Sequence, residues 1–291
     1  MGYTEENPEG GASMKPKKLI GLFHSASTTL RRKPRVSAVY LFLRIAVVIV
    51  LIAQCFNRNY ENVFLCVLTL ILFLIPTILE KELKIELPTA LEIIILLFVF
   101  AAEILGEIRA FYITYPGWDT LLHTLNGFLC AAIGFALVDM MNRNERLSLS
   151  LSPVYMAIVA FCFSMTIGVM WEFFECGMDQ FFLKDMQKDT VVTQISTVML
   201  DPQMANHTVV IRDIQDVILV TKDGEISLGL GGYLDLGLLD TMKDLAVNFV
   251  GAVAFSVIGF FYVKNRGKGK VASSFIPKVI DNFFETDGKH Q

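Results

Sequence analysis

The sequence is poor in charge and in any cysteine pattern that could hold a fold together. Asp, Glu, Lys and Arg make up 19% of its 291 residues, whereas a typical soluble domain has about 25%. None of its five cysteines forms a Cys-x-x-Cys pair, so we predict no disulfide framework and no zinc knuckle. The net charge of −4 gives no overall basic character, so we expect no nucleic-acid partner.

Several motifs of soluble enzymes are also missing. The chain has no Gly-x-Ser-x-Gly elbow, no HExxH, no P-loop and no dinucleotide-binding glycine fingerprint, so we predict no nucleotide or redox cofactor. Of four histidines, only His123 lies in a long apolar run, which excludes an all-histidine zinc site. A divalent metal ion on this chain would therefore have mostly oxygen ligands and at most one imidazole.

What the sequence has in abundance is long apolar runs. Residues of the AVILMFWYC set make up 54% of the chain, and the mean hydropathy is +0.53. A helix of about 20 apolar residues crosses a bilayer. Six runs reach that length: Val36–Phe56, Tyr60–Leu79, Pro88–Tyr112, Trp118–Met141, Pro153–Cys176 and Leu238–Val263. We therefore predict an all-α integral membrane protein, a bundle of six transmembrane helices.

The basic residues predict the orientation of this bundle. They gather before the first run, after the second and fourth, and after the sixth, whereas the opposite connections hold little more than Arg58 and Arg109. By the positive-inside rule, both termini are cytoplasmic. The predicted parts are a cytoplasmic basic tail (1–35), transmembrane helices one to five (36–181), an extracytoplasmic loop (182–237), transmembrane helix six (238–263) and a second cytoplasmic basic tail (264–291).

The loop 182–237 is the only sizeable aqueous segment predicted between spans. It contains short β-branched runs on both sides of Lys222-Asp223-Gly224. A turn of this kind between two such runs is typical of a β-hairpin. We expect this loop to be small and rich in β-structure.

Acidic residues collect at the predicted outer ends of four spans. Within each span they are three, four or seven residues apart, so they share one helix face. The four groups are Glu103 and Glu107; Asp119, His123 and Asn126; Glu172, Glu175 and Asp179; and Asp240, Asp244 and Asn248.

Such groups are costly in a membrane. An aspartate at a helix centre costs about 2.5–3.5 kcal/mol, and charged groups in spans mostly face a cavity or a partner. The excess of carboxylates predicts either protonated acids or a bound cation. We expect a divalent metal or a cationic ligand on Asp119, His123, Glu172, Glu175, Asp240 and Asp244, in a pocket completed by Glu103, Glu107, Asn126, Asp179 and Asn248.

Each group also has a purely structural explanation. Asp119 can be the N-cap of its helix, and His123 can simply hydrogen-bond a neighbouring carboxylate. Glu172, Glu175 and Asp179 can form a solvated helix end. Asp244 and Asn248, which lie inside the sixth span, are the hardest to explain this way. Gly251, one turn deeper, would permit a close helix approach.

Three segments carry a family resemblance. WDTLLHTLNG (Trp118–Gly127), WEFFECGMDQ at the end of the fifth span and GYLDLGLLDTMKDLAVNFVGA (Gly232–Ala252) resemble the YjdF-type membrane proteins of bacteria and, more distantly, VanZ-type proteins. VanZ-type proteins more usually have Glu-x-x-Gln where this chain has Glu172-x-x-Glu175. The resemblance implies a multi-pass protein of the bacterial cytoplasmic membrane, in contact with its lipids, whose motif surrounds an extracytoplasmic pocket.

The sequence leaves three functions open. The first is an outward-facing acidic and histidine pocket for metal-dependent hydrolysis or group transfer on an envelope or lipid-linked substrate, with His123, Glu175 or Asp244 as candidate catalytic groups. The second is a proton- or cation-coupled transporter, although the acids stop in one half of the spans. The third is a structural or interaction protein whose acids hold the helices together.

Overall fold

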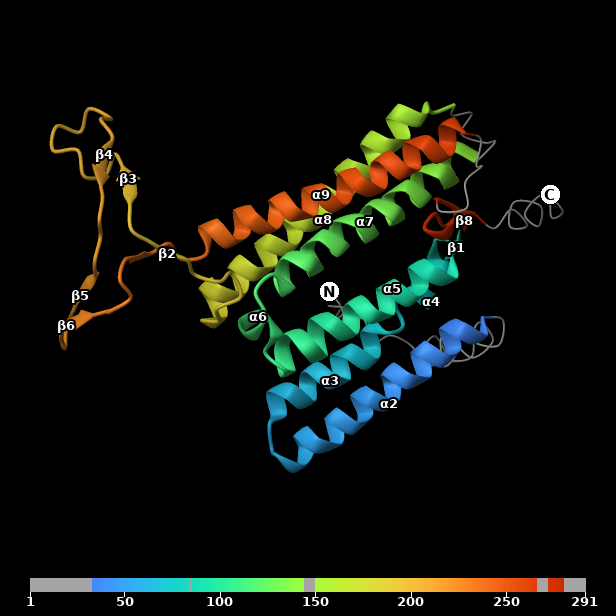
Figure 1. The fold of residues 1–291 in the computed structure, drawn as a ribbon, viewed down its shortest axis with the longest axis horizontal. Coiled ribbons are helices and arrows are strands. Elements are labelled where there is room, and N and C mark those ends of the chain that lie inside the picture. The colour runs from blue at the N-terminus through green and yellow to red at the C-terminus, as the bar shows by residue number, and fades with distance from the viewer. Residues whose placement is uncertain (1–32, 84, 144–149, 266–271, 280–291) are drawn as a thin grey trace, which may run out of the picture. The chain divides into compact units, whose positions relative to one another are not determined.

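The structure, a computed structural model, describes residues 33–83, 85–143, 150–265 and 272–279. Most of the two predicted basic tails lies outside these ranges. Within them, six helical stretches are long and apolar enough to cross a membrane (Figure 1): Pro34–Phe56, Tyr60–Glu82, Thr89–Ile108, Trp118–Asn142, Pro153–Phe182 and Leu238–Lys264. Each overlaps one predicted run, so the predicted fold class is confirmed.

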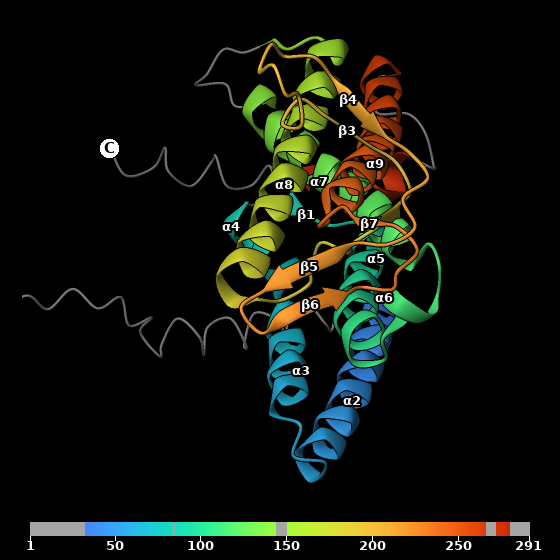
Figure 2. The ribbon, with the colours of Figure 1, turned by 90° about the vertical axis from the view of Figure 1, so that its left-hand side faces the viewer.

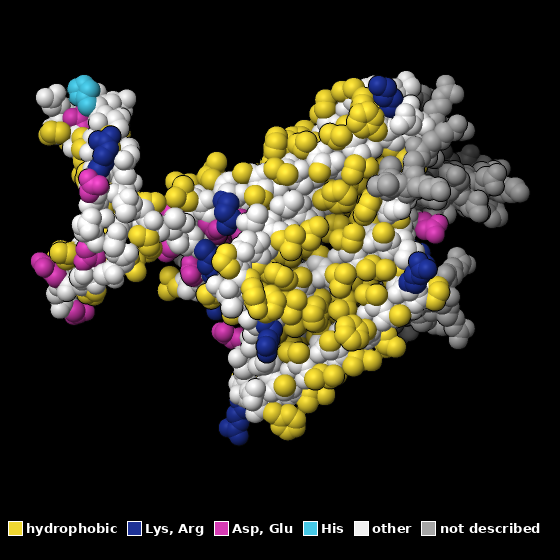
Figure 3. Space-filling view, viewed as in Figure 1, with side chains coloured by type: hydrophobic (Ala, Val, Ile, Leu, Met, Phe, Trp, Pro, Cys, Tyr) yellow, Lys and Arg dark blue, Asp and Glu magenta, His cyan; other side chains and the backbone are white. Residues whose placement is uncertain are grey.

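The described residues divide into two compact units. Of the described residues, the first unit comprises those up to 115, 139–143 and those from 265 onward, and the second comprises 116–138 and 150–264. In both, apolar side chains cover the sides of the helices, while most charged side chains lie at helix ends and on the strands (Figure 3). Apolar helix sides are what a lipid environment requires.

Helices of the first unit pack around a small apolar core. Its elements are α2 (Pro34–Phe56), α3 (Tyr60–Leu72), α4 (Ile75–Glu82), β1 (Ile85–Glu86), α5 (Thr89–Phe100), the π-helix η1 (Ala101–Ile108), α6 (Phe111–Thr114), η3 (Ala272–Ser274) and β8 (Lys278–Val279). Pro34 opens α2 in its first turn, where a missing N–H costs nothing. Residues spaced by three or four on α2, such as Leu43 and Val47, pack with Cys66 and Phe73.

A lysine fastens the start of α2 to α4 and α5. Lys33 Nζ donates to Glu80 Oε1 at 2.9 Å, to Glu92 Oε2 at 2.9 Å and to the Leu87 carbonyl at 2.7 Å. Burial lowers the pKa of Lys33, but the two carboxylates more than offset it, so this pKa lies above its ordinary value. Glu92, in the first turn of α5, is therefore a buried ion-pair partner.

The second unit is built on three long helices. They are α7 (Trp118–Arg143), of which residues 118–138 belong here, α8 (Pro153–Phe182) and α9 (Leu238–Lys264). Ser152 caps α8 by accepting the Tyr155 N–H. The buried face of α8 carries small and polar residues ending in Glu172 and Glu175, while the opposite face exposes Met170, Trp171, Phe173, Phe174, Phe181 and Phe182. This division is why α8 continues past Cys176, where the predicted span ended.

Two glycines bring α7 and α9 into backbone contact. A Cβ added to Gly251 would lie 1.9 Å from the Thr124 carbonyl oxygen, and one added to Gly127 would lie 2.1 Å from the Asn248 carbonyl oxygen. Close helix approach through small residues is characteristic of membrane interiors. The expected role of Gly251 therefore has a structural basis, and this contact sets the spacing of the polar groups one turn away.

Residues 183–237 form an arm of short strands that extends beyond the ends of α8 and α9 (Figure 1). It holds three two-stranded antiparallel sheets: β2 (Val191–Val192) with β7 (Tyr233–Leu234), β3 (Ile195–Thr197) with β4 (Val209–Ile211), and β5 (Ile218–Thr221) with β6 (Gly224–Ser227). Figure 2 shows β5 and β6 side by side. Their two-residue turn, Lys222–Asp223, confirms the predicted hairpin.

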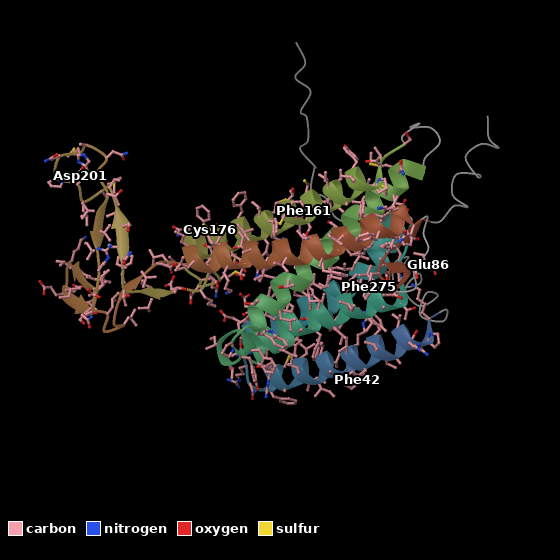
Figure 4. The ribbon with its side chains drawn as sticks, turned by 45° about the horizontal axis from the view of Figure 1, so that its top comes forward. Phe42, Glu86, Phe161, Cys176, Asp201 and Phe275 are labelled. Atoms are coloured by element: carbon pink, nitrogen blue, oxygen red, sulfur yellow. The ribbon has the colours of Figure 1, made fainter. Side chains whose placement is uncertain are left out.

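One buried carboxylate organises the loop between β3 and β4. Asp201, in the arm (Figure 4), accepts the backbone N–H groups of His207, Gln203 and Ala205 at 3.0, 3.0 and 2.8 Å. The His207 hydrogen bond is the largest of the effects that hold the pKa of Asp201 below its ordinary value.

This loop should therefore resist mild acid. Because the folded pKa of Asp201 is lowered, its contribution to stability is complete above the ordinary aspartate value of about 3.9 and is lost as the pH falls through the lowered value. Hydrogen exchange of the Ala205 and His207 amides, corrected for intrinsic rate, should lose protection only below about pH 4. The Asp201→Asn variant should lack this acid step, and protection lost already near neutral pH in the wild type would contradict the assignment.

Candidate metal site

Three side chains from α7 and α9 converge in the second unit. Asp119 and His123 lie one turn apart on α7, and Asp244 lies on α9. His123 Nε2 is 3.3 Å from Asp119 Oδ1 and 3.7 Å from Asp244 Oδ2. One ligand atom from each residue lies within 4.8 Å of the others. We refer to these three residues as the triad.

The triad has dimensions that suit a single ion. Two atoms bound to one metal at about 2.1 Å lie about 3–4 Å apart, and the two distances from Nε2, 3.3 and 3.7 Å, are within that range. The widest separation in the group, up to 4.8 Å, needs a small closing movement. Two carboxylate oxygens and one imidazole nitrogen form a donor set for a hard or borderline divalent cation.

Two buried oxygens beside the triad lack hydrogen bonds. Glu172 Oε1, on α8, lies 4.0 Å from His123 Nδ1, on the other edge of the imidazole. In the part of the chain that the structure describes, Glu172 Oε2 and Asp244 Oδ1 are buried without a hydrogen-bond partner. Asp244 Oδ1 still has the Lys243 ammonium at 3.5 Å. Glu172 Oε2 has no partner described, and a buried carboxylate oxygen of this kind is costly unless a further donor or cation reaches it.

A lysine lies on the other side of the same carboxylates. Lys243 Nζ is 3.1 Å from Asp119 Oδ2, 2.7 Å from Asp240 Oδ1 and 3.5 Å from Asp244 Oδ1. Asp240 Oδ2 in turn accepts the backbone N–H of Lys188, at the start of the arm, at 2.8 Å. Asp240 therefore contacts Lys243 and the arm, and no ion pair or hydrogen bond described for it reaches His123.

A pair of asparagines lies one turn deeper than the triad. Asn126 Nδ2 donates to Asn248 Oδ1 at 3.2 Å, and Asn248 Nδ2 lies 3.6 Å from Met165 Sδ on α8. Gly168 leaves the room that the Asn248 amide fills, since a Cβ there would lie 2.7 Å from Nδ2. The amide of Asn248 thus joins all three helices beneath the triad.

Aromatic side chains of α7 and α9 pack against each other on the side of the asparagines away from the triad. The Phe255 ring meets the rings of Phe128 and Phe135 at centroid distances of 5.1 and 6.0 Å. Phe135 and Phe255 are fully buried. Beyond the asparagines, α7 and α9 therefore pack through these three rings, next to the buried Ser256.

The remaining predicted site residues lie elsewhere or have other partners. Glu175 Oε1 accepts the indole N–H of Trp171 at 2.8 Å. Asp179 accepts the backbone N–H groups of Met186 and Gln187 at 2.6 and 2.9 Å, and so fastens the loop that follows α8. Glu103 and Glu107 lie on η1, which belongs to the first unit.

Sequence reasoning missed two contributors to this site. Lys243 is not among the residues predicted for the site, although its position three residues after Asp240 and one before Asp244 places it beside both on a helix. Met165 gave no signal, because a methionine in an apolar span is ordinary core.

Most of the chain matches a known protein family. The family described as "Predicted membrane protein (DUF2238)" matches residues 39–265. The chain belongs to the DUF2238 family. This match covers all three long helices of the candidate site and is consistent with the resemblance to YjdF-type proteins, whereas it gives no link to VanZ-type proteins. The DUF2238 chain has no match among curated proteins or among solved structures.

Proposed function

We propose that this DUF2238 protein binds a divalent cation at the triad of Asp119, His123 and Asp244. The observation that carries the proposal is the convergence of three ligand atoms from two helices: Asp119 Oδ1 and Asp244 Oδ2 lie 3.3 and 3.7 Å from His123 Nε2. Glu172, whose Oε1 lies 4.0 Å from Nδ1 on the other edge of the imidazole, is placed to orient the histidine rather than to bind the ion. Mn²⁺ and Zn²⁺ suit such a mixed oxygen and nitrogen set.

The proposal includes an orientation in the bacterial cytoplasmic membrane, among its lipids. Basic residues such as Lys264 end α9 at the end opposite the arm, and the positive-inside rule then gives cytoplasmic termini and an extracytoplasmic arm. The triad, near the arm ends of α7 and α9, would accept its ion from outside. The test is a single cysteine placed at Lys222 and treated with an impermeant maleimide on intact cells. Labelling is expected if the arm is extracytoplasmic, and a cysteine that is not labelled would contradict this orientation.

A metal held here would suit hydrolysis or group transfer on an envelope or lipid-linked substrate. When bound, the metal would supply Lewis-acid activation of water or of a substrate oxygen. Glu172 and Glu175, buried on α8, are the carboxylates from which a proton acceptor would come. The exposed aromatic face of α8 beside them suits contact with a lipid chain.

Transport is the second candidate, and the packed phenylalanine rings beyond the asparagines argue against it. The buried rings of Phe135 and Phe255 lie beyond the asparagines, where a permeation path would need polar groups or water. Flux of Mn²⁺ into proteoliposomes that is lost in Asp244→Asn would establish transport in place of a closed binding site.

The test of binding is metal content and affinity in the purified full chain. Wild-type protein in detergent, prepared without chelator, should bind one Mn²⁺ or Zn²⁺ per chain. His123→Ala and Asp244→Asn should each lose binding by about 100-fold or more, since each removes one of few ligands. Glu225→Gln, on the exposed strand β6, is the control and should bind as the wild type does.

Thermal stability separates this proposal from the structural alternative. If no metal binds under any condition, while His123→Ala and Asp244→Asn lower the melting temperature, the cluster serves only to hold α7 and α9 together. Stabilisation of the wild type by added metal, absent in both variants, is the expected result.

A further inference from the structure

The two carboxylates of the triad each direct one oxygen to His123 and the other to Lys243. Asp119 Oδ1 lies 3.3 Å from the imidazole, and Oδ2 lies 3.1 Å from Lys243 Nζ. Asp244 repeats this division, with Oδ2 at 3.7 Å from the imidazole and Oδ1 at 3.5 Å from Nζ. A cation among the three triad atoms and the ammonium of Lys243 would therefore use different oxygens, so they do not compete for the same atoms.

Lys243 is itself held in place. Its shortest contact, 2.7 Å, is with Asp240 Oδ1, and Asp240 Oδ2 is fixed by the Lys188 N–H at 2.8 Å. Thr241, beside Asp240, is a hydrogen-bond partner of Gln187 in the same segment of the arm. Residues Gln187 and Lys188, at the start of the arm, thus fix the position of Asp240 and Thr241, and Asp240 in turn fixes the ammonium of Lys243.

We infer that Lys243 is a positioning residue of the metal site and that Asp240 is the anchor of Lys243 rather than a metal ligand. This inference rests on the proposed function. The ammonium orients the carboxylates of Asp119 and Asp244, which come from different helices, so that their other oxygens face the ion. It also offsets part of the negative charge that these carboxylates, with Asp240, bring to the site. Groups that orient metal ligands in this way typically contribute 10–100-fold in metal affinity.

A positioning role for Lys243 and simple charge competition predict opposite changes in metal affinity when the lysine is removed. If Lys243 competed with the ion, its removal would tighten metal binding. If it positions the ligands, its removal weakens binding although the site becomes more negative. Asp240 gives the second distinction: as an anchor it acts only through Lys243, whereas as a ligand it would act independently.

The experiment is a Mn²⁺ titration of the full chain in detergent, followed by the EPR signal of free Mn²⁺. Lys243→Gln should bind about 10–100-fold more weakly than the wild type, and Lys243→Arg should recover most of the loss because a guanidinium also bonds carboxylates. Asp240→Asn should lose a similar factor, and the double variant Asp240→Asn/Lys243→Gln should lose no more than the single ones. Lys222→Gln, in the exposed turn of the arm, is the matched control and should be unchanged.

The outcomes separate this inference from the proposed function. If the wild type binds no Mn²⁺ or Zn²⁺, both fall. If the wild type binds and Lys243→Gln binds equally or more tightly, only the inference falls. Multiplicative losses in the double variant would make Asp240 an independent ligand and would also overturn it. Should Lys243→Gln fail to fold, Lys243→Met takes its place in the single and the double variant, with the same expected and contradicting results, and normal binding in Asp240→Asn overturns the inference.

Discussion

Gly251→Ala should separate α7 from α9 and abolish the metal binding proposed for the triad, although it adds a single methyl group. The new Cβ would lie 1.9 Å from the Thr124 carbonyl oxygen and 2.9 Å from the Phe128 backbone nitrogen. These are backbone atoms, so no side-chain rotation relieves the overlap and the helices must move. Overpacking typically costs about 1–3 kcal/mol, and we expect the upper end here. The His123–Asp244 distance of 3.7 Å spans the same helix pair, so the triad should open as well.

The measurement is the melting temperature in detergent together with Mn²⁺ affinity, both on the full chain. Gly177→Ala on α8 is the matched control, because a Cβ there meets nothing closer than a Phe181 ring carbon at 4.0 Å, and alanine favours the helix. This variant should be as stable as the wild type or slightly more so. Normal stability and binding in Gly251→Ala would mean that α7 and α9 are not in backbone contact.

Lys33→Met should be the most damaging single change in the first unit. It removes the cation that Glu80 and Glu92 share, and it leaves the buried Glu92 carboxylate without that partner. Removing one partner of a buried ion pair costs about 3–5 kcal/mol. We expect the lower end, about 3 kcal/mol, because Glu80 is more exposed than Glu92 and solvent can partly stabilise its charge. Loss of stability should appear as a lower melting temperature in detergent.

A triple variant separates the ion pairs from the side-chain volume at this position. Lys33→Met combined with Glu80→Gln and Glu92→Gln removes all three charges, so it should regain much of the lost stability. Lys81→Met, on the exposed side of α4, is the control and should have little effect. If the triple variant is no more stable than Lys33→Met, the cost comes from the lost hydrogen bond to Leu87 rather than from unpaired carboxylates.

The spans could be predicted because a bilayer imposes length and hydropathy on each segment separately. The ends were harder to predict. Glu172 and Glu175 interrupt the apolar run, yet α8 continues to Phe182 because these acids face the helix neighbours while aromatic residues face outward. The π-helix at Ala101–Ile108 has no counterpart in the hydropathy pattern, since apolar residues alone do not distinguish α from π hydrogen bonding.

The site could be predicted as far as helix periodicity reaches. The spacing of Asp119 and His123 and that of Asp240 and Asp244 are local, so their shared faces follow from sequence. The contacts between helices, such as Lys243 with Asp119 over 124 positions and Lys33 with Glu92 over 59, depend on which helices pack and at what depth. Asp179 illustrates the limit: it continues the acidic face of α8, yet its partners are backbone groups of the following loop.

The place of α9 in the chain has a consequence for biogenesis. Membrane proteins are inserted from the N-terminus as they are made, and α9 is the last of the long helices. Until it enters, Asp119, His123 and Glu172 are already in place on α7 and α8 without Asp244 and without Lys243. The final helix brings the third triad residue and the balancing ammonium together. Of the residues described here, the triad and its ammonium are therefore completed only when α9 has entered.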